Sequence, residues 1–172
     1  MRVVDELIEE LIRTGRDITN AELRELRRLV ADAGFGPNAI SPAGGDVAGL
    51  VWQGMNIASG DWLPNETLHF LKHVVAGQEW PTGTSLDEHV QCLRDTILEE
   101  EGAVSMEQVH TFHRLTFLSS SNRWRGPNGG PWILVGYNIN YAYWSTGFQP
   151  KQRQISFIQE ERSNRRWLQR LS

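Results

Sequence analysis

The sequence has few of the features that mark exported, membrane-spanning or disulfide-built proteins. Cys92 is the only cysteine, so no disulfide can form within the chain. No apolar run comes near the roughly 20 residues that span a bilayer. Acidic residues interrupt the apolar stretch "MRVVDELIEELIRTG", unlike the core of a secretory signal peptide. These absences favour a soluble protein in a reducing compartment, so we expect a cytoplasmic location and no membrane partner.

Histidine is also scarce, and its distribution raises the central question of the sequence. All five histidines lie between Leu68 and Arg114, and three of them fall in "LHFLKHVVAGQEWPTGTSLDEHV". Histidine is the side chain whose ordinary pKa lies nearest to neutrality, so a cluster of histidines is a candidate site of proton transfer. The alternative is that composition and packing alone placed them there.

The charged residues divide the chain into an acidic front and a basic tail. The net charge is -4, yet from Arg123 onward eight Lys and Arg residues stand against two acidic residues, Glu160 and Glu161. The basic tail favours an anionic partner such as RNA, whereas the acidic helices of the front favour a protein partner. A solvated basic face, or attraction between the two halves, explains the same asymmetry.

Two helices are expected in residues 1–34. The first has apolar residues at helical spacing and ends at Gly15. The second, within "TNAELRELRRLVADAGFG", has an N-cap at Thr19 or Asn20, and the two form a helical hairpin. Residues 35–60 are rich in Gly, Pro, Ser and Asn and predict a linker or a long ordered loop, whose apolar pieces pack on the core or form a short strand.

A second helical pair is expected over residues 61–101. Gly77 ends its first helix, and Thr84 or Ser85 begins the second, with an acidic residue three positions on. An antiparallel return of the second helix would bring its histidine toward the first helix.

The corner between these helices is expected to be held by packing. Trp80 in "GQEWPTGTS" is predicted to be a peg that closes the corner. His89 lies one turn into the return helix and can then approach His73. Cys92 follows at a helical spacing that indicates packing, although a catalytic thiol there is the alternative.

Strand patterns follow the helices. The segments "FHRLTFLSS", "PWILVGYNI" and "YAYWSTGFQ" predict three antiparallel strands within residues 110–159, and "KQRQISFIQ" is a candidate fourth strand. Residues 160–172 are expected to be a basic tail or a short helix. The order of elements predicts a single α+β domain, in which N-terminal helices precede a three- to four-stranded antiparallel sheet.

His69 and His73 are the strongest candidates for chemistry. They are four residues apart on an expected helix, so they share a face, at the edge of its apolar stripe. They can serve as an acid and a base, or as hydrogen-bonded structural residues. A metal site is not favoured, because zinc hydrolysis needs a third ligand and a base, as in H-E-x-x-H, and Lys72 would lie beside the cation. We therefore expect no metal and no cofactor.

Metal-free cleavage of RNA needs a base for the 2′-hydroxyl, an acid for the leaving oxygen and groups that hold the phosphate. The histidines suit the first two roles. Arg123 and Arg125 flank Trp124 in "RWRGPNGG" and offer phosphate contacts around a stacking surface, and Ser145 and Thr146 add hydroxyls. The alternative for this loop is an ordinary hairpin turn with its tryptophan folded over the sheet.

The order of these segments resembles the BECR ribonucleases, the group named for barnase, EndoU, colicin nucleases and RelE and common among bacterial polymorphic toxins. The resemblance covers about residues 65–158 and rests on "HFLKHVVAG" and "YWSTGFQP". It implies metal-free RNA cleavage, with His73 as base or acid and Ser145 or Thr146 at the phosphate. The chain departs from the family in having "TGF" where members often have "TAF" or "TAY".

Two other functions fit the same residues. One is a non-enzymatic domain that binds a protein through its acidic helices or aromatic sheet and whose histidines are structural. The other is nucleic-acid binding without cleavage, which needs the basic tail but not the histidines. Convergence of the helix histidines and a sheet arginine on one polar cleft would favour the enzyme.

Overall fold

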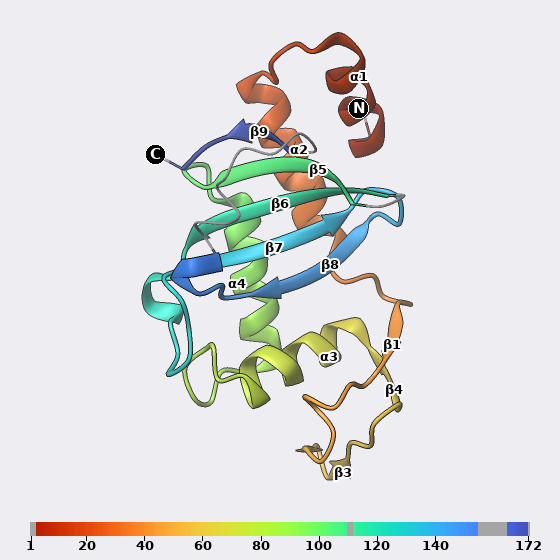
Figure 1. Ribbon diagram of the computed structural model, residues 1–172, viewed down its shortest axis with the longest axis vertical. Coiled ribbons are helices and arrows are strands. Elements are labelled where there is room, and N and C mark those ends of the chain that lie inside the picture. The colour runs from red at the N-terminus through yellow and green to blue at the C-terminus, as the bar shows by residue number, and fades with distance from the viewer. Residues whose placement is uncertain (1–2, 110–111, 155–164, 172) are drawn as a thin grey trace.

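The computed structural model describes residues 3–109, 112–154 and 165–171, which form an α+β fold with helices before the main sheet, as predicted (Figure 1). The helices are α1 (Val4–Thr14), α2 (Asn20–Ala33), α3 (Asn65–Phe70), the π-helix η1 (Leu71–Ala76), α4 (Leu86–Leu98) and the short 3-10 turn η2 (Asn122–Trp124). The strands are β1 (Ile40–Pro42), β2 (Val51–Trp52), β3 (Met55–Asn56), β4 (Trp62–Pro64), β5 (Ala103–Val109), β6 (Phe112–Ser120), β7 (Trp132–Asn138), β8 (Tyr143–Phe148) and β9 (Arg165–Gln169).

The helical hairpin at the front forms as its sequence predicts. α1 buries one apolar face and ends at Gly15, which has a φ of 68° and donates its N–H to the carbonyl of Leu11. α2 begins after Thr19, whose hydroxyl accepts from the N–H of Glu22 while the Glu22 carboxylate accepts from the N–H of Thr19. This reciprocal cap satisfies two N–H groups that the first turn would otherwise leave free.

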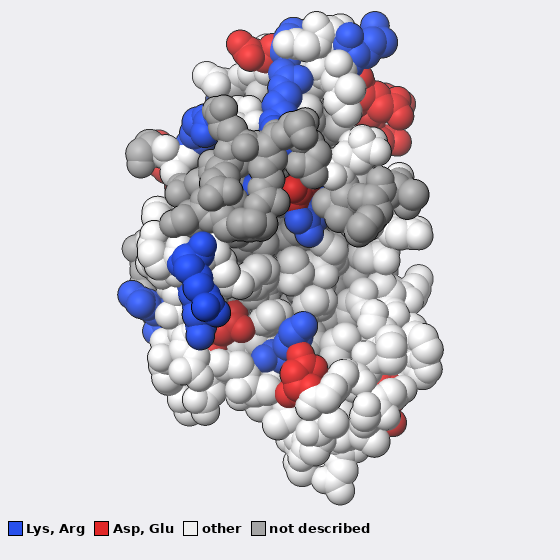
Figure 2. Space-filling view, in the orientation of Figure 1, with Lys and Arg blue, Asp and Glu red and all other residues white. Residues whose placement is uncertain are grey.

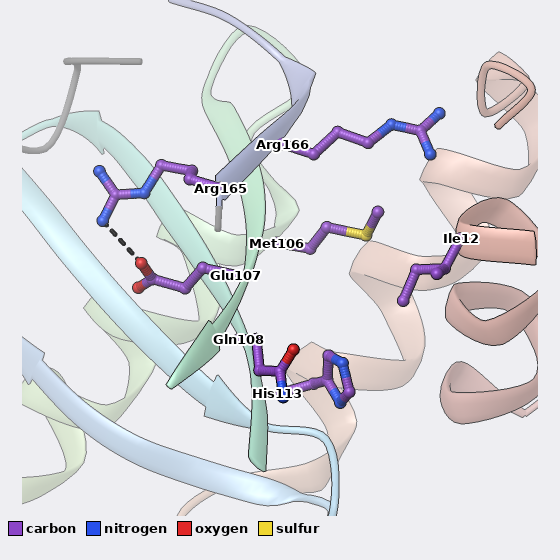
Figure 3. A pocket seen from close by; sticks show the side chains of 7 residues that line it. All are labelled: Ile12, Met106, Glu107, Gln108, His113, Arg165 and Arg166. Atoms are coloured by element: carbon purple, nitrogen blue, oxygen red, sulfur yellow. Dashed lines mark hydrogen bonds and ion pairs between the residues drawn. The ribbon is translucent and has the colours of Figure 1, made fainter. Parts of the chain in front are cut away.

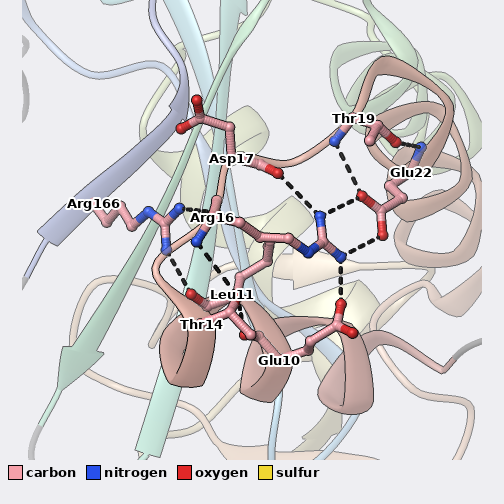
Figure 4. Close-up of polar contacts among 8 residues, drawn as sticks. All are labelled: Glu10, Leu11, Thr14, Arg16, Asp17, Thr19, Glu22 and Arg166. Carbon is pink, nitrogen blue, oxygen red and sulfur yellow. Dashed lines mark hydrogen bonds and ion pairs between the residues drawn. The ribbon is translucent and has the colours of Figure 1, made fainter.

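A polar cluster ties this hairpin to the sheet (Figure 4). Arg16, in the turn between α1 and α2, pairs with the carboxylates of Glu10 and Glu22. Arg166 of β9 donates to the main-chain carbonyls of Leu11 and Arg16. The end of α1 is therefore fixed against the strand at the edge of the sheet.

Residues 35–60, expected as a linker or an ordered loop, form two short ribbons together with β4, which takes residues 62–64 from the segment expected to begin the second helical pair. β1 pairs with β4, with Ser41 opposite Leu63, and β2 pairs with β3. Val47 and Ile57 are buried in the main core, so this segment packs on the rest of the protein as its apolar pieces predict. The ribbons lie beside α3, at the end of the molecule opposite α1 (Figure 1).

The helix that carries His69 and His73 changes type halfway along. α3 runs to Phe70, and η1 continues it as a π-helix, whose end is marked by a hydrogen bond of 2.9 Å from the N–H of Gly77 to the carbonyl of Lys72. π-Helical turns are rare and are often found at functional sites.

The corner between η1 and α4 is held as predicted. Trp80 is fully buried, and its indole N–H donates to the sulfur of Cys92 at 3.5 Å. α4 begins after Ser85, which forms a reciprocal cap with Glu88. Cys92 is therefore a packed residue of the core.

The main sheet is antiparallel, with its strands in the order β8–β7–β6–β5–β9. β6, β7 and β8 are the three strands predicted most clearly. The sheet is wider than expected, because β5 begins at Ala103, before residue 110, and β9 takes residues from the segment expected as a tail or helix. Of the candidate fourth strand, residues 152–154 are helical, which corrects that prediction, and residues 155–159 lie outside the described residues.

Helices α2 and α4 cover one face of this sheet (Figure 1). The core between them includes Leu26, Leu93, Phe117, Val135 and Trp144. A smaller apolar cluster of Ala103, Leu118 and Leu134 lies on the other face. No helix within residues 3–109, 112–154 and 165–171 combines the length and the apolar composition needed to cross a membrane.

Candidate functional site

Four rings, which we call the histidine column, stack beside the end of β8. His69 and His73 lie with their ring centres 5.9 Å apart and their planes 10° apart. Phe35 stacks on the outer side of His69 at 5.1 Å, and Phe148 of β8 stacks on the outer side of His73 at 5.6 Å. The structure therefore brings together the two histidines that their spacing had paired.

A carboxylate fixes the orientation of one ring in the column. Nδ1 of His73 lies 2.7 Å from Oε2 of Glu79, in a contact where the side chains are 10% and 16% exposed. Oε1 of Glu79 accepts from the main-chain N–H of Gln149 at 2.7 Å. An ionised carboxylate can only accept, so Nδ1 of His73 is the donor in this contact and Nε2 is the ring nitrogen that points away from Glu79.

The backbone conformation of residues 77–79 brings the carboxylate of Glu79 to Nδ1 of His73. Gly77 has no room for a side chain, because a Cβ there would lie 2.8 Å from the carbonyl oxygen of Lys72. Gln78 then takes a positive φ of 52°, and the N–H of Glu79 bonds back to the carbonyl of His73 at 3.0 Å. The end of the π-helix therefore turns the chain back on itself, and the carboxylate meets the ring that lies before the turn.

His69 differs electrostatically from its neighbour. Burial lowers the pKa of His69 to about 4, and the nearby His73 and Lys72 act in the same direction, while Asp46 opposes them. Its Nδ1 is buried and has no hydrogen-bond partner among the residues that the structure describes. At neutral pH His69 is therefore uncharged and can accept a proton, but it does not carry one to donate as an imidazolium.

The loop of residues 123–131 is attached to the main chain of Glu79 and to the side chain of Gln149. The N–H of Gly126 donates to the main-chain carbonyl of Glu79 at 2.7 Å, and the side-chain amide of Gln149 donates to the carbonyl of Trp124 at 2.6 Å. Arg123 lies over the indole of Trp124, 5.3 Å from the ring centre. The Arg–Trp–Arg segment predicted to bind nucleic acid is thus next to the histidine column.

The cations of this loop have no acidic partners in the described part of the chain. Arg125 donates Nε to the carbonyl of Gly129, and neither Arg123 nor Arg125 forms an ion pair there. Figure 2 shows Lys and Arg side chains gathered at the lower left of the molecule, where η2 and the following loop lie in Figure 1. This end of the protein therefore presents basic side chains that form no ion pair with the residues that the structure describes.

Ser145 and Thr146 are not placed with the histidines. A Cβ on Gly136 would lie 3.0 Å from Oγ of Ser145, 3.2 Å from Cγ2 of Thr146 and 3.6 Å from Cδ of Arg114. The Oγ of Ser145 is buried and has no partner in the described residues. The hydroxyl of Ser145 and the methyl group of Thr146 therefore lie close to Gly136 in the sheet, and Phe148 is the residue of β8 that stacks on the histidine column.

His89 and His113 lie outside the histidine column. His89 is fully buried, and burial, with His73 and His69 acting in the same direction, lowers its pKa to about 3. Figure 1 shows α4 running across the direction of α3 instead of antiparallel to it, which corrects the expected return of this helix. His113 lines a hollow near α1. His110 lies outside the described residues.

That hollow, of about 330 Å³, offers little uncommitted charge (Figure 3). It is lined by Ile12, Met106, Glu107, Gln108, His113, Arg165 and Arg166. Burial disfavours the charged form of Glu107, yet Arg114 and Arg165 outweigh it and hold the pKa of this carboxyl below its ordinary value. Arg166 donates to main-chain carbonyls, so its charge has partners as well.

The histidine column can transfer protons next to a surface suited to an anion. Within the described ranges, no three His, Cys, Asp or Glu side chains are arranged to hold a metal ion. Among the described residues, no printed contact joins a sheet arginine to His69 or His73, and the cation that acts on His69 is Lys72.

Two essential contributors were missed in the sequence. Glu79 lies in the segment "GQEWPTGTS", six residues after His73. Its spacing does not predict a contact with the imidazole, because the π-helix that produces the contact cannot be predicted from composition. Gln149 was missed as well, since its role comes from its main-chain N–H.

Comparison with family models, with curated proteins and with solved structures finds no match to this chain. The resemblance to the BECR ribonucleases therefore rests on the residues of the sequence alone, and the function has to be argued from the site.

Proposed function

We propose that this protein cleaves RNA without a metal ion, with His73 as the general base. The observation that carries the proposal is the hydrogen bond of 2.7 Å between His73 and the carboxylate of Glu79. The same carboxylate accepts a second hydrogen bond from the main-chain N–H of Gln149. A carboxylate on one ring nitrogen fixes the tautomer, aims the other nitrogen and stabilises the ring when it takes a proton. Nε2 of His73 has no hydrogen-bond partner in the described residues, and the proposed scheme assigns this nitrogen to the substrate.

The proposed reaction uses the nucleophile that RNA itself supplies. Nε2 of His73 accepts the proton of a 2′-hydroxyl, and the 2′ oxygen attacks the adjacent phosphorus. The bond from phosphorus to the 5′ oxygen breaks, and this oxygen takes a proton from solvent while His73 returns its proton to solvent. In this scheme Arg123 and Arg125 would stabilise the charge on the phosphate, because their loop bonds to Glu79 and Gln149.

Glu79 acts through His73 and is a positioning residue in this scheme. Replacement by glutamine keeps the size of the side chain but removes the charge that stabilises the protonated ring. Glu79→Gln should therefore lower kcat and leave KM nearly unchanged.

The test uses purified protein, mixed cellular RNA and excess EDTA. His73→Ala should lower cleavage about 100-fold or more, and His113→Ala, in the hollow near α1, is the matched control. The cleavage rate should rise with pH to a plateau, and its pH profile should not be bell-shaped. His69, with a pKa of about 4, supplies no imidazolium acid at neutral pH. RNA that stays intact at high protein concentration would reject the proposal for these substrates.

A second candidate is RNA binding without cleavage. The specific observation in its favour is that Arg123 and Arg125 lack ion-pair partners in the described residues, a feature that needs no chemistry at the histidines. Binding that falls steeply with salt and is unchanged in His73→Ala, without cleavage by the wild type, would favour it.

A protein-binding domain with structural histidines is the third candidate. The column buries His73 between two rings, as a packed structural residue would be, and the acidic front helices would be the docking surface. On this reading His73→Ala would lower the free energy of unfolding, and no RNA product would form with the wild type.

A further inference from the structure

A second hollow lies on the far side of the 123–131 loop from Glu79. Its volume is about 560 Å³. It is lined by Arg125, Pro127, Asn128, Gly129, Gly130, Pro131, Lys151 and Gln152. Two cations from separate segments, Arg125 and Lys151, therefore face one space whose other walls are mainly a loop rich in glycine and proline.

The charge of these two residues is uncompensated in the described part of the chain. Several other cations among the described residues have a carboxylate partner, as Lys72 has in Asp46 and Arg94 has in Asp32. Neither Arg125 nor Lys151 has an ion pair within the described residues. Two free cations at one hollow repel each other, and an anion bound between them would relieve that repulsion.

The loop is held in place before any ligand binds. Nε of Arg125 donates to the carbonyl of Gly129 at 3.1 Å, which orients the guanidinium and leaves its two terminal nitrogens for a ligand. A Cβ on Gly129 would lie 2.2 Å from Oε1 of Gln149, and one on Gly130 would lie 1.8 Å from the carbonyl oxygen of Pro150. The glycines are thus required by close packing, and little ordering remains to oppose binding.

The same packing joins this hollow to the histidine column. Gln149 bonds to Glu79 through its main-chain N–H and to Trp124 through its side chain. Lys151 follows two residues later in the chain. A single RNA strand bound at His73, with a base stacked on Trp124, would therefore continue toward Arg125 and Lys151.

The geometry points to a second phosphate subsite in this hollow. It binds a phosphate that neighbours, along the same RNA strand, the phosphate held at His73. This inference rests on the proposed function and specifies its substrate as single-stranded RNA. Trp124 can stack only on a base that is free of a duplex, and the two cations then hold the backbone beyond it.

The experiment measures binding separately from cleavage. The probe is a fluorescein-labelled single-stranded RNA of about 12 nucleotides, and the protein is the full chain carrying His73→Ala, so that the probe stays intact. Anisotropy gives the affinity in EDTA at several salt concentrations. Arg125→Gln and Lys151→Gln, each added to this background, should weaken binding and reduce the slope of log K against log salt by about 0.7.

Arg24→Gln is the matched control, because Arg24 is exposed on α2, away from the loop, and the slope should not change. Lys151→Glu should weaken binding further than Lys151→Gln, and circular dichroism confirms that each variant is folded. A duplex of the same sequence should bind more weakly than the single strand.

Unchanged slopes in both the Arg125 and Lys151 variants, or a loss as large in Arg24→Gln, would overturn the subsite. Equal binding of the duplex would overturn the single-strand assignment. If the wild type cleaves RNA while these slopes stay unchanged, the subsite fails and the proposed function stands. If the slopes change but the wild type does not cleave, the subsite stands and the proposed function fails.

Discussion

The indole of Trp80 meets the imidazole of His89 edge to face, with the ring centres 4.6 Å apart. His89 has no exposed surface, and neither of its ring nitrogens makes a hydrogen bond of good geometry to the described residues, although the nearby main chain of Gly147 opposes the lowering of its pKa. Phe70 covers another side at 6.0 Å. Burial, with the nearby His73 and His69 acting in the same direction, lowers the pKa of His89 to about 3, so the folded protein holds this ring uncharged.

Acid should therefore destabilise the protein well above the pH at which carboxylates titrate. In the unfolded chain His89 and His69 take up protons near pH 6.5, whereas in the folded chain they do so only near 3 and 4. The stabilising effect is complete above pH 6.5 and is lost as the pH falls below it. Each ring should lower the free energy of unfolding by up to about 1.4 kcal/mol per pH unit, which urea unfolding at pH 7.5 and 5.5 would measure.

His89→Leu separates this effect from other titrations. Leucine fills a similar space and removes two buried nitrogens without partners in the described residues. The variant should be at least as stable as the wild type at pH 7.5 and should lose less stability between pH 7.5 and 5.5. An identical loss in both proteins would show that His89 is protonated in the folded state.

Arg27 should be among the residues whose replacement costs most stability. It is 2% exposed on α2, and it donates to the carbonyls of Ile97 and Gly102, both at 3.0 Å, where α4 ends and β5 begins. Arg27→Ala removes the Arg27 donor from both carbonyls, of which Gly102 keeps a bond from the side chain of Gln169, and should lower the free energy of unfolding by about 3 kcal/mol. Arg24→Ala, on the exposed face of the same helix, should change it by no more than about 0.5 kcal/mol.

Gly147 is expected to be intolerant of even a methyl group. A Cβ there would lie 2.4 Å from Cδ1 of Leu93 on α4. Gly147→Ala should therefore destabilise the protein by about 1 to 3 kcal/mol. In combination with Leu93→Ala the two losses should be clearly less than additive, because the smaller side chain makes room for the methyl group. Additive losses in a double-mutant cycle would contradict the contact.

Cys92 should be unreactive while the protein is folded. It is 2% exposed, and burial raises its pKa to about 12, although the indole N–H of Trp80 opposes the shift. A thiol reagent at pH 8 should find no reactive group in native protein and one per chain in guanidinium chloride. Rapid labelling of the native protein would show that the corner at Trp80 opens readily.

Local patterns in the sequence predicted the local structure well. The caps at Thr19 and Ser85 depend on residues three positions apart, and both formed as expected. The three aromatic segments formed β6, β7 and β8 because turn residues separate them clearly. These elements are specified by neighbours in the chain.

Elements that depend on distant neighbours were missed. β9 is a strand because β5 offers it a free edge, although its sequence reads equally well as a helix or a tail. β5 itself follows the acidic end of α4 and was not separated from it. The spacing of His69 and His73 predicted their contact, but the position of Glu79 depends on the π-helix and the positive φ of Gln78, which no local pattern revealed.

The histidine site was therefore only half visible before the structure. The two rings were predicted, while the carboxylate that orients His73 was not. Ser145 and Thr146 were grouped with the histidines by resemblance, and the structure places them close to Gly136 in the sheet, so their proposed role at the phosphate has no geometric support among the described contacts.

The pairing of β9 with β5 also bears on how the protein is made. β9 lies about sixty residues after β5, its partner in the sheet. Its residue Arg166 donates a hydrogen bond to the carbonyl of Leu11 in α1, near the start of the sequence. During synthesis on the ribosome, β5 must therefore wait with an open edge until β9 has emerged. Such an edge is a template for pairing with other chains. Because β9 is synthesised last of the five strands, the nascent chain is most prone to aggregate just before β9 has emerged from the ribosome.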